Sequence, residues 1–494
     1  MERLTTRRLG TLPATVRTPR YDRDRLEIGL AHIGVGAFHR CHLAEYTDDM
    51  LEAAFGRWGS VGINIRPPRL ADSLGAQDGL YTRTLRTGAS AQTRVIGCIR
   101  RVIDVESPLD AASAIDAIAS PHVGTVTLTL TEKGYCHMPA TGVLDPRQTD
   151  VIHDLAAPPQ PRTALGLLAA AFERRMLVGA GPLSVVSCDN LPSNGALLAR
   201  VMSDFVAARP AALRRWMADN IAFPGTMVDR IVPATTSEDI AFASGQLGAA
   251  DQAAVVGEPF RQWVLSDGFA GERPPWDLAG AQFVPNVQPY ELVKMRVLNA
   301  AQSTLSHLGP FLGHDFSFQA AADPLLARYV RRMLTEETAP TLANLDGMPT
   351  AAYIDTTFQR IGNPAIRHRC HQIGTDGSQK IVQRLINPMR ERLAAGRPAP
   401  LLTLAIAAWV AYVLAGAALF GRRWSAIDPF ASQVVALSDG CQGDLVALAN
   451  RILSIGQIFG TLAPNDQLCA TVARHIAGLH SRAPRDYLLS VLDL

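Results

Sequence analysis

The chain has 494 residues, of which 48% are hydrophobic and 19% charged, and its formal net charge is +2. This length predicts two or three domains, and the near-neutral charge, without a run of Lys or Arg, excludes a chain built to follow a nucleic-acid backbone. The seven cysteines lie far apart and form no C-x-x-C pair, so neither a disulfide framework nor a structural zinc site is expected. Because MERLTTRRLG has no signal-peptide core, we expect a cytoplasmic protein.

The first half of the chain alternates strand-like and helix-like segments. An apolar run, a glycine turn and a helix make up EIGLAHIGVGAFHRCHLAEYTDDMLEAAF, and later strands are predicted in SVGINIR, TVTLTLTEKGY and PLSVVSCDN. Strands that alternate with helices indicate a parallel sheet covered by helices. We therefore expect an α/β protein in which residues 1–287 form a Rossmann-like, dinucleotide-binding domain.

Two glycines follow the first predicted strand. In IGVGAFHR, Gly34 and Gly36 stand between strand and helix, where glycine lets the backbone approach a pyrophosphate and the helix N-terminus attracts its charge. His39 takes the place of the third glycine of G-x-G-x-x-G. We predict that this turn binds a dinucleotide through Gly34, Gly36, Ala37, Phe38 and His39.

The end of the second predicted strand has no acidic residue for the adenosine ribose. VGINIRPPR ends instead with Arg66, Pro67, Pro68 and Arg69. The two arginines suit a 2′-phosphate, which would favour NADP, while a solvated loop is an equally good interpretation. We expect NAD as the cofactor, with NADP possible and Arg66 among the contacts.

From about Tyr290 helical patterns dominate, and 288–494 are expected to form a mostly α-helical substrate or catalytic domain. The segment from Leu401 to Gly421 is long and uncharged enough for a transmembrane helix, with Arg422 and Arg423 as a positive flank. Its alanine content and the lack of a second span favour a helix buried inside the domain. We therefore expect no membrane partner.

Lys294 lies among apolar residues of a predicted helix, in PYELVKMRVLNAAQSTLSHLG. An amine in apolar surroundings loses hydration, which lowers its pKa and suits a general base; the alternative is a lysine whose stem packs while its head reaches water. In a regular α-helix Asn299 and Gln302 lie about 140° and about 80° from Lys294, so all three can face one cleft. The histidines and cysteines form no H-E-x-x-H or similar grouping, and RHRCH (367–371) is interpreted as a basic wall, so no metal is expected.

Several stretches together resemble a known family. HIGVGAFHRCH, AQDGLYTRTL, TLTEKGY, SCDNLPSNG, FPGTMVDRIVPATT, YELVKMRVLNA and RHRCHQIGTDGSQKIVQR occur in this order. The chain resembles the mannitol dehydrogenase family of long-chain, zinc-independent polyol and hexuronate oxidoreductases over almost its whole length. It looks most like the fructuronate reductase (mannonate oxidoreductase) branch.

The resemblance implies roles for particular residues. Lys294 would be the general acid and base, Asn190 and Asn299 would donate hydrogen bonds to the developing alkoxide, and Glu291 would relay protons. Glu132 would be a further cofactor contact. The substrate-binding residues implied are Asp229, Gln302, Gln372, Lys380 and Arg367.

Gln302 departs from the family pattern, and this affects the prediction of the substrate more than that of the reaction type. Where relatives usually carry a histidine, this chain has Gln302, which cannot carry a proton charge near neutral pH. A sugar acid would need a cation such as Lys380, Arg367 or Arg369, whereas Asp229, Gln302 and Gln372 better serve a polyol. We expect NAD(P)-dependent interconversion of alcohol and ketone on a sugar acid of the D-mannonate/D-fructuronate type. The alternatives are a polyol dehydrogenase and a catalytically silent binding protein, and a monomer or a small homo-oligomer is expected.

Overall fold

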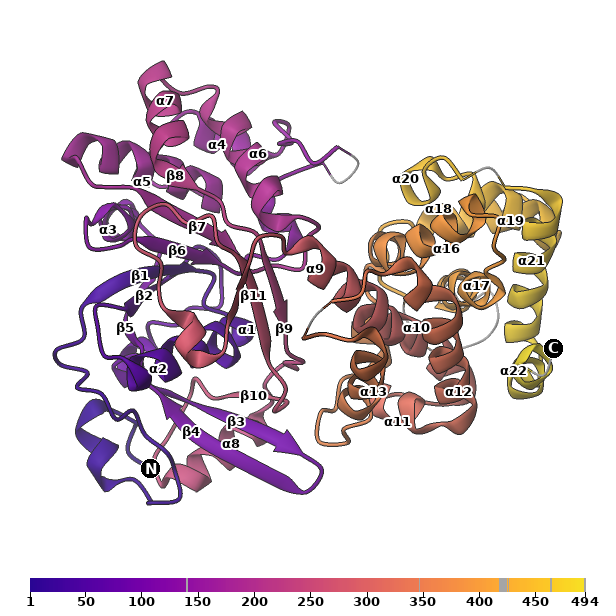
Figure 1. Cartoon of the computed structure of the whole chain (residues 1–494), viewed down its shortest axis with the longest axis horizontal. Helices are drawn as coiled ribbons and strands as arrows, with labels where there is room; N and C mark the ends of the chain where they lie inside the picture. The colour runs from indigo at the N-terminus through magenta and orange to yellow at the C-terminus, as the bar shows by residue number, and fades with distance from the viewer. Residues whose placement is uncertain (139–140, 346, 417–423, 425, 463, 493–494) are drawn as a thin grey trace. The chain divides into compact units, whose positions relative to one another are not determined.

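The computed structural model describes residues 1–138, 141–345, 347–416, 424, 426–462 and 464–492. By its internal contacts the chain divides into two compact units, Met1–Gln288 and Pro289–Leu494. The first contains the β-sheets and the second is built from helices (Figure 1).

A parallel sheet forms the centre of the first unit. When these parallel strands alone are numbered along the chain, their spatial order is 3-2-1-4-5-6, which is the doubly wound order. The chain therefore builds the sheet outward from β1 on one side and then returns to build the other side. Ile33 of β1 lies opposite Ile63 of β2 and Leu128 of β6. The topological switch point therefore lies between β1 and β6, and the expected Rossmann-like fold is confirmed. In spatial order the strands are β5 (Ile99–Asp104), β2 (Gly59–Asn64), β1 (Ile28–Ile33), β6 (Thr125–Leu128), β7 (Leu183–Ser187) and β8 (Ile221–Ala222).

Helices cover both faces of this sheet (Figure 1). Ala31 and Ile33 of β1 join the core under one group of helices, whereas Leu30 joins the core under the other. Apolar side chains on both faces are what a sheet covered on both sides requires. The first group is α3 (Pro108–Ala119), α5 (Ala164–Val178), α6 (Asn194–Val206) and α7 (Ala211–Asn220); the second is α1 (Ala37–Cys41) and α2 (Leu43–Ala53).

The strands outside the parallel sheet were not predicted as separate sheets. The connection from β2 to β5 contains an antiparallel hairpin, which turns at Gly88 with φ +52°. Its first strand, YTRTLRT, is rich in the threonine and tyrosine that favour strands, and its first four residues are buried. The hairpin is β3 (Tyr81–Thr87) and β4 (Ser90–Ile96), joined by β10 (Val255–Gly257); a further sheet contains β9 (Thr226–Asp229), β11 (Gln262–Ser266) and β12 (Gln282–Val284).

Helix α17 (Pro400–Gly416) lies in the core of the second unit. Every side chain from Leu401 to Ala415 is buried, and the helix packs against α10 (Ala300–Leu308), α18 (Ala431–Asp439) and α21 (Asp466–His480). This confirms the buried-helix interpretation for the described part of that segment; 417–423, with both flanking arginines, lie outside the described residues. Within the described ranges no helix has the length and hydropathy to cross a membrane.

The helix that carries Lys294 is not a regular α-helix. Helix α9 (Gln288–Lys294) passes into a π-helical segment, η5 (Met295–Asn299), before α10 begins. Ala300 N–H donates to the Met295 carbonyl group, five residues earlier. Residues five apart in such a turn lie nearly above one another. The angle of about 140° expected between Lys294 and Asn299 from α-helical geometry is therefore wrong, and the two residues lie closer to the same side.

Candidate functional site

A cleft of about 680 Å³ opens in the first unit where β1, β2 and β6 end. Ligands of doubly wound sheets bind at this edge, beside the switch point. Its walls are the loop after each of these strands and the start of α5. The lining includes Gly34–Ala37, Asn64–Pro68, Thr129–Thr131 and Arg162–Ala164.

The two glycines of the turn have different reasons to be glycine. Gly34 has φ +93°, and a Cβ there would lie 2.2 Å from the Thr129 carbonyl oxygen, so the close approach of two loops requires glycine. A Cβ at Gly36 would meet nothing nearer than the Gly34 carbonyl oxygen at 3.9 Å. Packing within the protein does not explain Gly36, which lines the cleft. A ligand that approaches the backbone there does explain it.

Two of the predicted residues of the turn, Phe38 and His39, do not line the cleft. His39 is 3% exposed, and its ring stacks on His32 with 3.4 Å between centroids. Burial, followed by the nearby His32, places the pKa of His39 well below its usual value. The Phe38 ring stacks on His42. Among the described residues that line the cleft, Ala37 is present but Phe38 and His39 are not.

The cleft carries an excess of positive charge. Arg40, Arg66, Lys133 and Arg162 line it, and Asp150 is the one acidic residue among its described lining. Arg66 Nη2 lies 2.7 Å from Asp150 Oδ2. An anionic ligand such as a pyrophosphate suits this charge distribution.

Asp189, which sequence reasoning overlooked, shapes the loop after β6. Its carboxylate accepts hydrogen bonds from Leu130 N (2.8 Å), Thr131 N (3.0 Å) and the Tyr135 hydroxyl (2.6 Å). Burial raises the pKa of Asp189, while these hydrogen bonds oppose the rise. A carboxylate directly after a buried strand, next to Asn190 in SCDN, is the signal that could have identified it.

Two predicted site residues, the catalytic candidate Asn190 and the substrate-binding candidate Asp229, lie at the ends of two strands of the first unit. Asn190 is exposed just after β7, and the buried Asp229 ends β9. The Thr226 hydroxyl donates to the Ser187 carbonyl group at 2.7 Å, so the start of β9 lies against the end of β7. Glu132 is half-buried on η3 (Glu132–Tyr135), between two residues that line the cleft.

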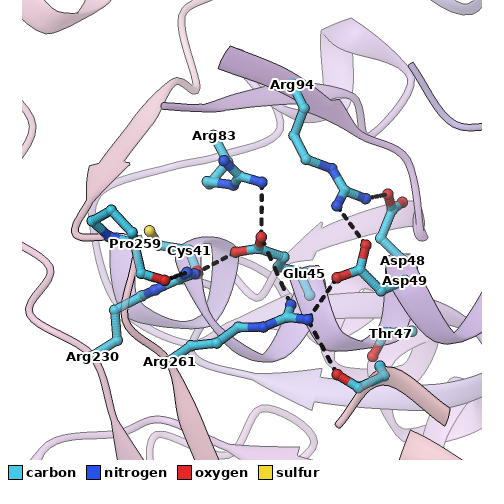
Figure 2. Close-up of polar contacts among 12 residues, drawn as sticks. Cys41, Glu45, Thr47, Asp48, Asp49, Arg83, Arg94, Arg230, Pro259 and Arg261 are labelled. Carbon is cyan, nitrogen blue, oxygen red and sulfur yellow. Dashed lines mark hydrogen bonds and ion pairs between the residues drawn. The ribbon is translucent and has the colours of Figure 1, made fainter. Parts of the chain in front are cut away.

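A buried ion network supports the residue after Asp229 (Figure 2). The Arg230 guanidinium group pairs with Glu45 of α2 and donates to the Cys41 carbonyl group. Glu45 also accepts from Arg83 at 2.7 Å. Burial alone would raise the pKa of Glu45, but the surrounding arginine charges outweigh it and hold the pKa at about 2. The network thus fixes the end of β9 against α2.

In the second unit, Lys294 and Asn299 occupy the two ends of the π-helical turn. Lys294 is 5% exposed and Asn299 is 6% exposed. Arg384, on the π-helical segment η9 (Val382–Ile386), donates to the Asn299 carbonyl group at 3.4 Å. The Asn299 side-chain oxygen is buried without a hydrogen-bond partner in the described structure. That oxygen is available to a ligand.

Lys380 lies close to two histidines of the same unit. Its Nζ donates to the Ile373 and Thr375 carbonyl groups at 3.2 and 2.5 Å. Burial and then the Lys380 charge lower the pKa of His307 to about 3 and that of His368 to about 4. Both imidazoles are therefore neutral near pH 7. Gln302 and Glu291 are half-buried on the Lys294 helix.

Two arginines of the predicted basic wall share one aromatic partner. The exposed Arg367 and Arg369 guanidinium groups stack over Phe316, 5.0 and 4.9 Å from its ring centroid. Gln372 is also exposed, on α14 (Cys370–Gly374). The described part of the chain contains no group of three or more His, Cys, Asp or Glu residues that could hold a metal ion.

The strand order and the glycine-lined cleft define a Rossmann-like α/β protein with a helical second domain. Residues 28–278 match the mannitol dehydrogenase Rossmann domain, and 286–480 match the mannitol dehydrogenase C-terminal domain. The chain therefore belongs to the mannitol dehydrogenase family, as its motifs indicated. It is an oxidoreductase of the class that acts on CH–OH groups.

Relatives of two substrate types are similar to it. The D-mannonate oxidoreductase of Escherichia coli is 36% identical over 452 residues, which cover 91% of each chain. The mannitol 2-dehydrogenase of Cereibacter sphaeroides is 34% identical over 464 residues, 93% of this chain and 95% of the relative. Among solved structures, the Pseudomonas fluorescens mannitol 2-dehydrogenase ternary complex with NAD and D-mannitol superposes with a TM-score of 0.89, at 34% identity and 99% coverage of both chains.

Proposed function

We propose that the protein is an NAD-dependent dehydrogenase that interconverts the secondary alcohol and the ketone of an open-chain sugar acid of the D-mannonate/D-fructuronate type. Residues 1–287 would bind the dinucleotide, and 288–494 would supply the general acid and base. The observation that carries this proposal is the burial of Lys294 beside a π-helical turn in a chain of this family.

Lys294 is proposed to exchange the proton of the reacting hydroxyl group. Lys294 is 5% exposed and its chain neighbours Val293 and Met295 are buried, so bulk water has little access to its side chain. In alcohol oxidation the neutral amine takes the hydroxyl proton, and in ketone reduction the ammonium group returns it. Glu291, one helical turn earlier and half-buried, is proposed to pass that proton to solvent.

Two amide groups are proposed to stabilise the oxyanion. The side-chain N–H groups of Asn190 and Asn299 would donate to the substrate oxygen as negative charge develops on it. Such a donor typically lowers the activation barrier by about 3 kcal/mol. The buried side-chain oxygen of Asn299, which has no partner among the described residues, can accept a hydrogen bond from a substrate hydroxyl group, because a buried polar atom without a partner is costly.

The cleft of the first unit fits the dinucleotide. Gly34, Gly36 and Ala37 would let the pyrophosphate approach the backbone, and the surrounding cations would neutralise it. NAD, when bound, supplies the acceptor for the hydride that leaves the alcohol carbon. The similarity to a solved complex with NAD and D-mannitol supports this assignment.

The choice of a sugar acid rests on Lys380 and on the similarity to the D-mannonate oxidoreductase. Lys380 is a half-buried cation beside His307 and His368, which suits a carboxylate, whereas Arg367 is exposed over Phe316. Asp229, Gln302 and Gln372 would contact the hydroxyl groups. A D-mannitol/D-fructose activity is the second candidate, because mannitol 2-dehydrogenases are similarly close in sequence.

A direct comparison of substrates tests the proposal. The purified protein, supplied with NADH, should reduce D-fructuronate with a higher kcat/KM than D-fructose. Turnover of D-fructose or D-mannitol alone would favour the polyol candidate. Lys294→Ala should abolish turnover of every substrate while dinucleotide binding persists. Binding of dinucleotide and sugar without any turnover by the wild type would favour a silent binding protein.

A further inference from the structure

The adenosine end of the cleft lacks the carboxylate that usually follows the second strand of a Rossmann-like domain. Strand β2 ends at Asn64, whose amide is already engaged. Its oxygen accepts from Val35 N at 3.2 Å, and its nitrogen donates to the Pro68 carbonyl group at 3.1 Å. Asn64 thus holds two loops together, and recognition of the ribose falls to other residues.

Arg66 and Asp150 meet across this end of the cleft, from the loop after β2 and from α4 (Thr149–Leu155). Their side chains are 69% and 36% exposed, and they form an ion pair at 2.7 Å. Arg69, three residues further along the loop, is 54% exposed and lies 3.0 Å from Glu106. Arg69 is not among the described residues that line the cleft. Arg69 also lies 3.5 Å from Asp72. The loop therefore carries two exposed, ion-paired arginines, of which only Arg66 is among the described residues that line the cleft.

An exposed ion pair is worth only about 0–1 kcal/mol, so its partners exchange at little cost. An arginine binds a phosphate group through two parallel hydrogen bonds, which are stronger than ordinary ones. A 2′-phosphate would therefore compete with Asp150 for Arg66, but the Asp150 charge would repel that phosphate. The Asp150 carboxylate, the acidic group among the described lining, can instead accept hydrogen bonds from the hydroxyl groups of an unphosphorylated ribose.

We propose that the Arg66–Asp150 pair sets the choice between NAD and NADP. Asp150 neutralises Arg66 and keeps the cleft selective for NAD; without the Asp150 charge, Arg66 becomes a 2′-phosphate site. This inference rests on the proposed dinucleotide function of the cleft. It places the specificity-determining carboxylate on α4 rather than at the end of β2.

The test measures the dissociation constants of NADH and NADPH by fluorescence titration, independently of any sugar turnover. Asp150→Asn should tighten NADPH binding about tenfold relative to NADH, and Arg66→Ala, added to it, should remove that gain. The matched controls are Glu106→Gln and Arg69→Ala, which remove the same charges from the neighbouring pair. These control variants should change the ratio of the NADPH and NADH dissociation constants by less than about twofold.

Equal shifts in Asp150→Asn and Glu106→Gln would overturn the inference, since the effect would then be one of general charge. An unchanged ratio in Asp150→Asn, with both dinucleotides still bound, would also overturn it and leave the proposed dehydrogenase intact. A shifted ratio in a protein that turns over no sugar would uphold the inference while the proposed reaction fails. The four side chains are at least partly exposed, so the variants are expected to fold, which circular dichroism checks.

Discussion

Glu45 and Arg230 form a buried ion pair although 185 positions separate them in the chain. Glu45 belongs to α2, which follows the glycine turn, and Arg230 directly follows Asp229 at the end of β9. The same guanidinium group donates to the Cys41 and Phe260 carbonyl groups. One arginine thus joins α1, which begins at the cleft, and α2 to the strand that carries a proposed substrate residue.

Replacement of Arg230 by Lys keeps the charge but removes most of these hydrogen bonds. We expect the KM for the sugar to rise by roughly tenfold, because Asp229 loses its fixed backbone position, while the KM for the dinucleotide changes little. Steady-state kinetics with each substrate varied in turn measures both. Arg94→Lys is the control, since Arg94 is equally buried and pairs with Asp48, but lies on β4. Equal effects of the two variants on the sugar KM would contradict a positioning role.

The stability contributed by Glu45 should depend on pH. Burial opposes ionisation of Glu45, but the charges of Arg230, Arg83 and Arg261 lower its pKa from an ordinary 4.5 to about 2. The folded state therefore favours the carboxylate by on the order of 3 kcal/mol, a contribution complete above about pH 4.5 and lost as the pH falls toward about 2. Glu45→Gln lacks it at every pH. The difference in free energy of unfolding between wild type and variant, measured with urea, should shrink as the pH is lowered from about 4.5 to about 2. A difference that stays constant over this range would contradict the proposed contribution of the Glu45 carboxylate.

The two glycines of the cleft should respond differently to alanine. Gly34→Ala would force a Cβ against the Thr129 carbonyl oxygen at a positive φ, so we expect a loss of several kcal/mol in the free energy of unfolding. Gly36→Ala meets open space and should change stability by less than about 1 kcal/mol. It should nevertheless weaken dinucleotide binding by roughly tenfold or more, because the backbone approach is blocked. Thermal unfolding and fluorescence titration separate the two effects, and unchanged binding by Gly36→Ala would contradict its assignment.

The pH profile of alcohol oxidation should show no histidine ionisation near neutrality in the wild type. Burial and the Lys380 charge lower the pKa values of His307 and His368 to about 3 and about 4, and Gln302 does not titrate. Gln302→His introduces a half-buried imidazole, so its profile of kcat/KM should gain an ionisation at about pH 6–7. Gln302→Asn is the control without a titratable group. Lys294 contributes its own ionisation to all three profiles, so only the extra ionisation is diagnostic. Equal profiles for Gln302→His and Gln302→Asn would contradict the prediction.

Features set by a few neighbouring residues could be predicted from the sequence. The turn at Gly34 and Gly36, the buried strand before it and the apolar residues on both sides of Lys294 in the chain were all visible in the local pattern. Glycine acts through its own φ angle, and strands and helices repeat their exposure every two or 3.6 residues. The family motifs then added roles for residues that no periodicity distinguishes.

Other features needed the tertiary structure because they join residues far apart in the chain. Arg66 and Asp150 are 84 positions apart, and Asp189 lies 59 positions from the Leu130 amide group that it binds. Their meeting depends on the strand order around the switch point, which spacing in the sequence does not encode. The π-helical turn after Lys294 is likewise held in part from outside, by Arg384 on another segment. The sequence by itself determined which chemical groups the protein possesses and the local structure around them, whereas the long-range packing of strands and helices decided which of those groups meet.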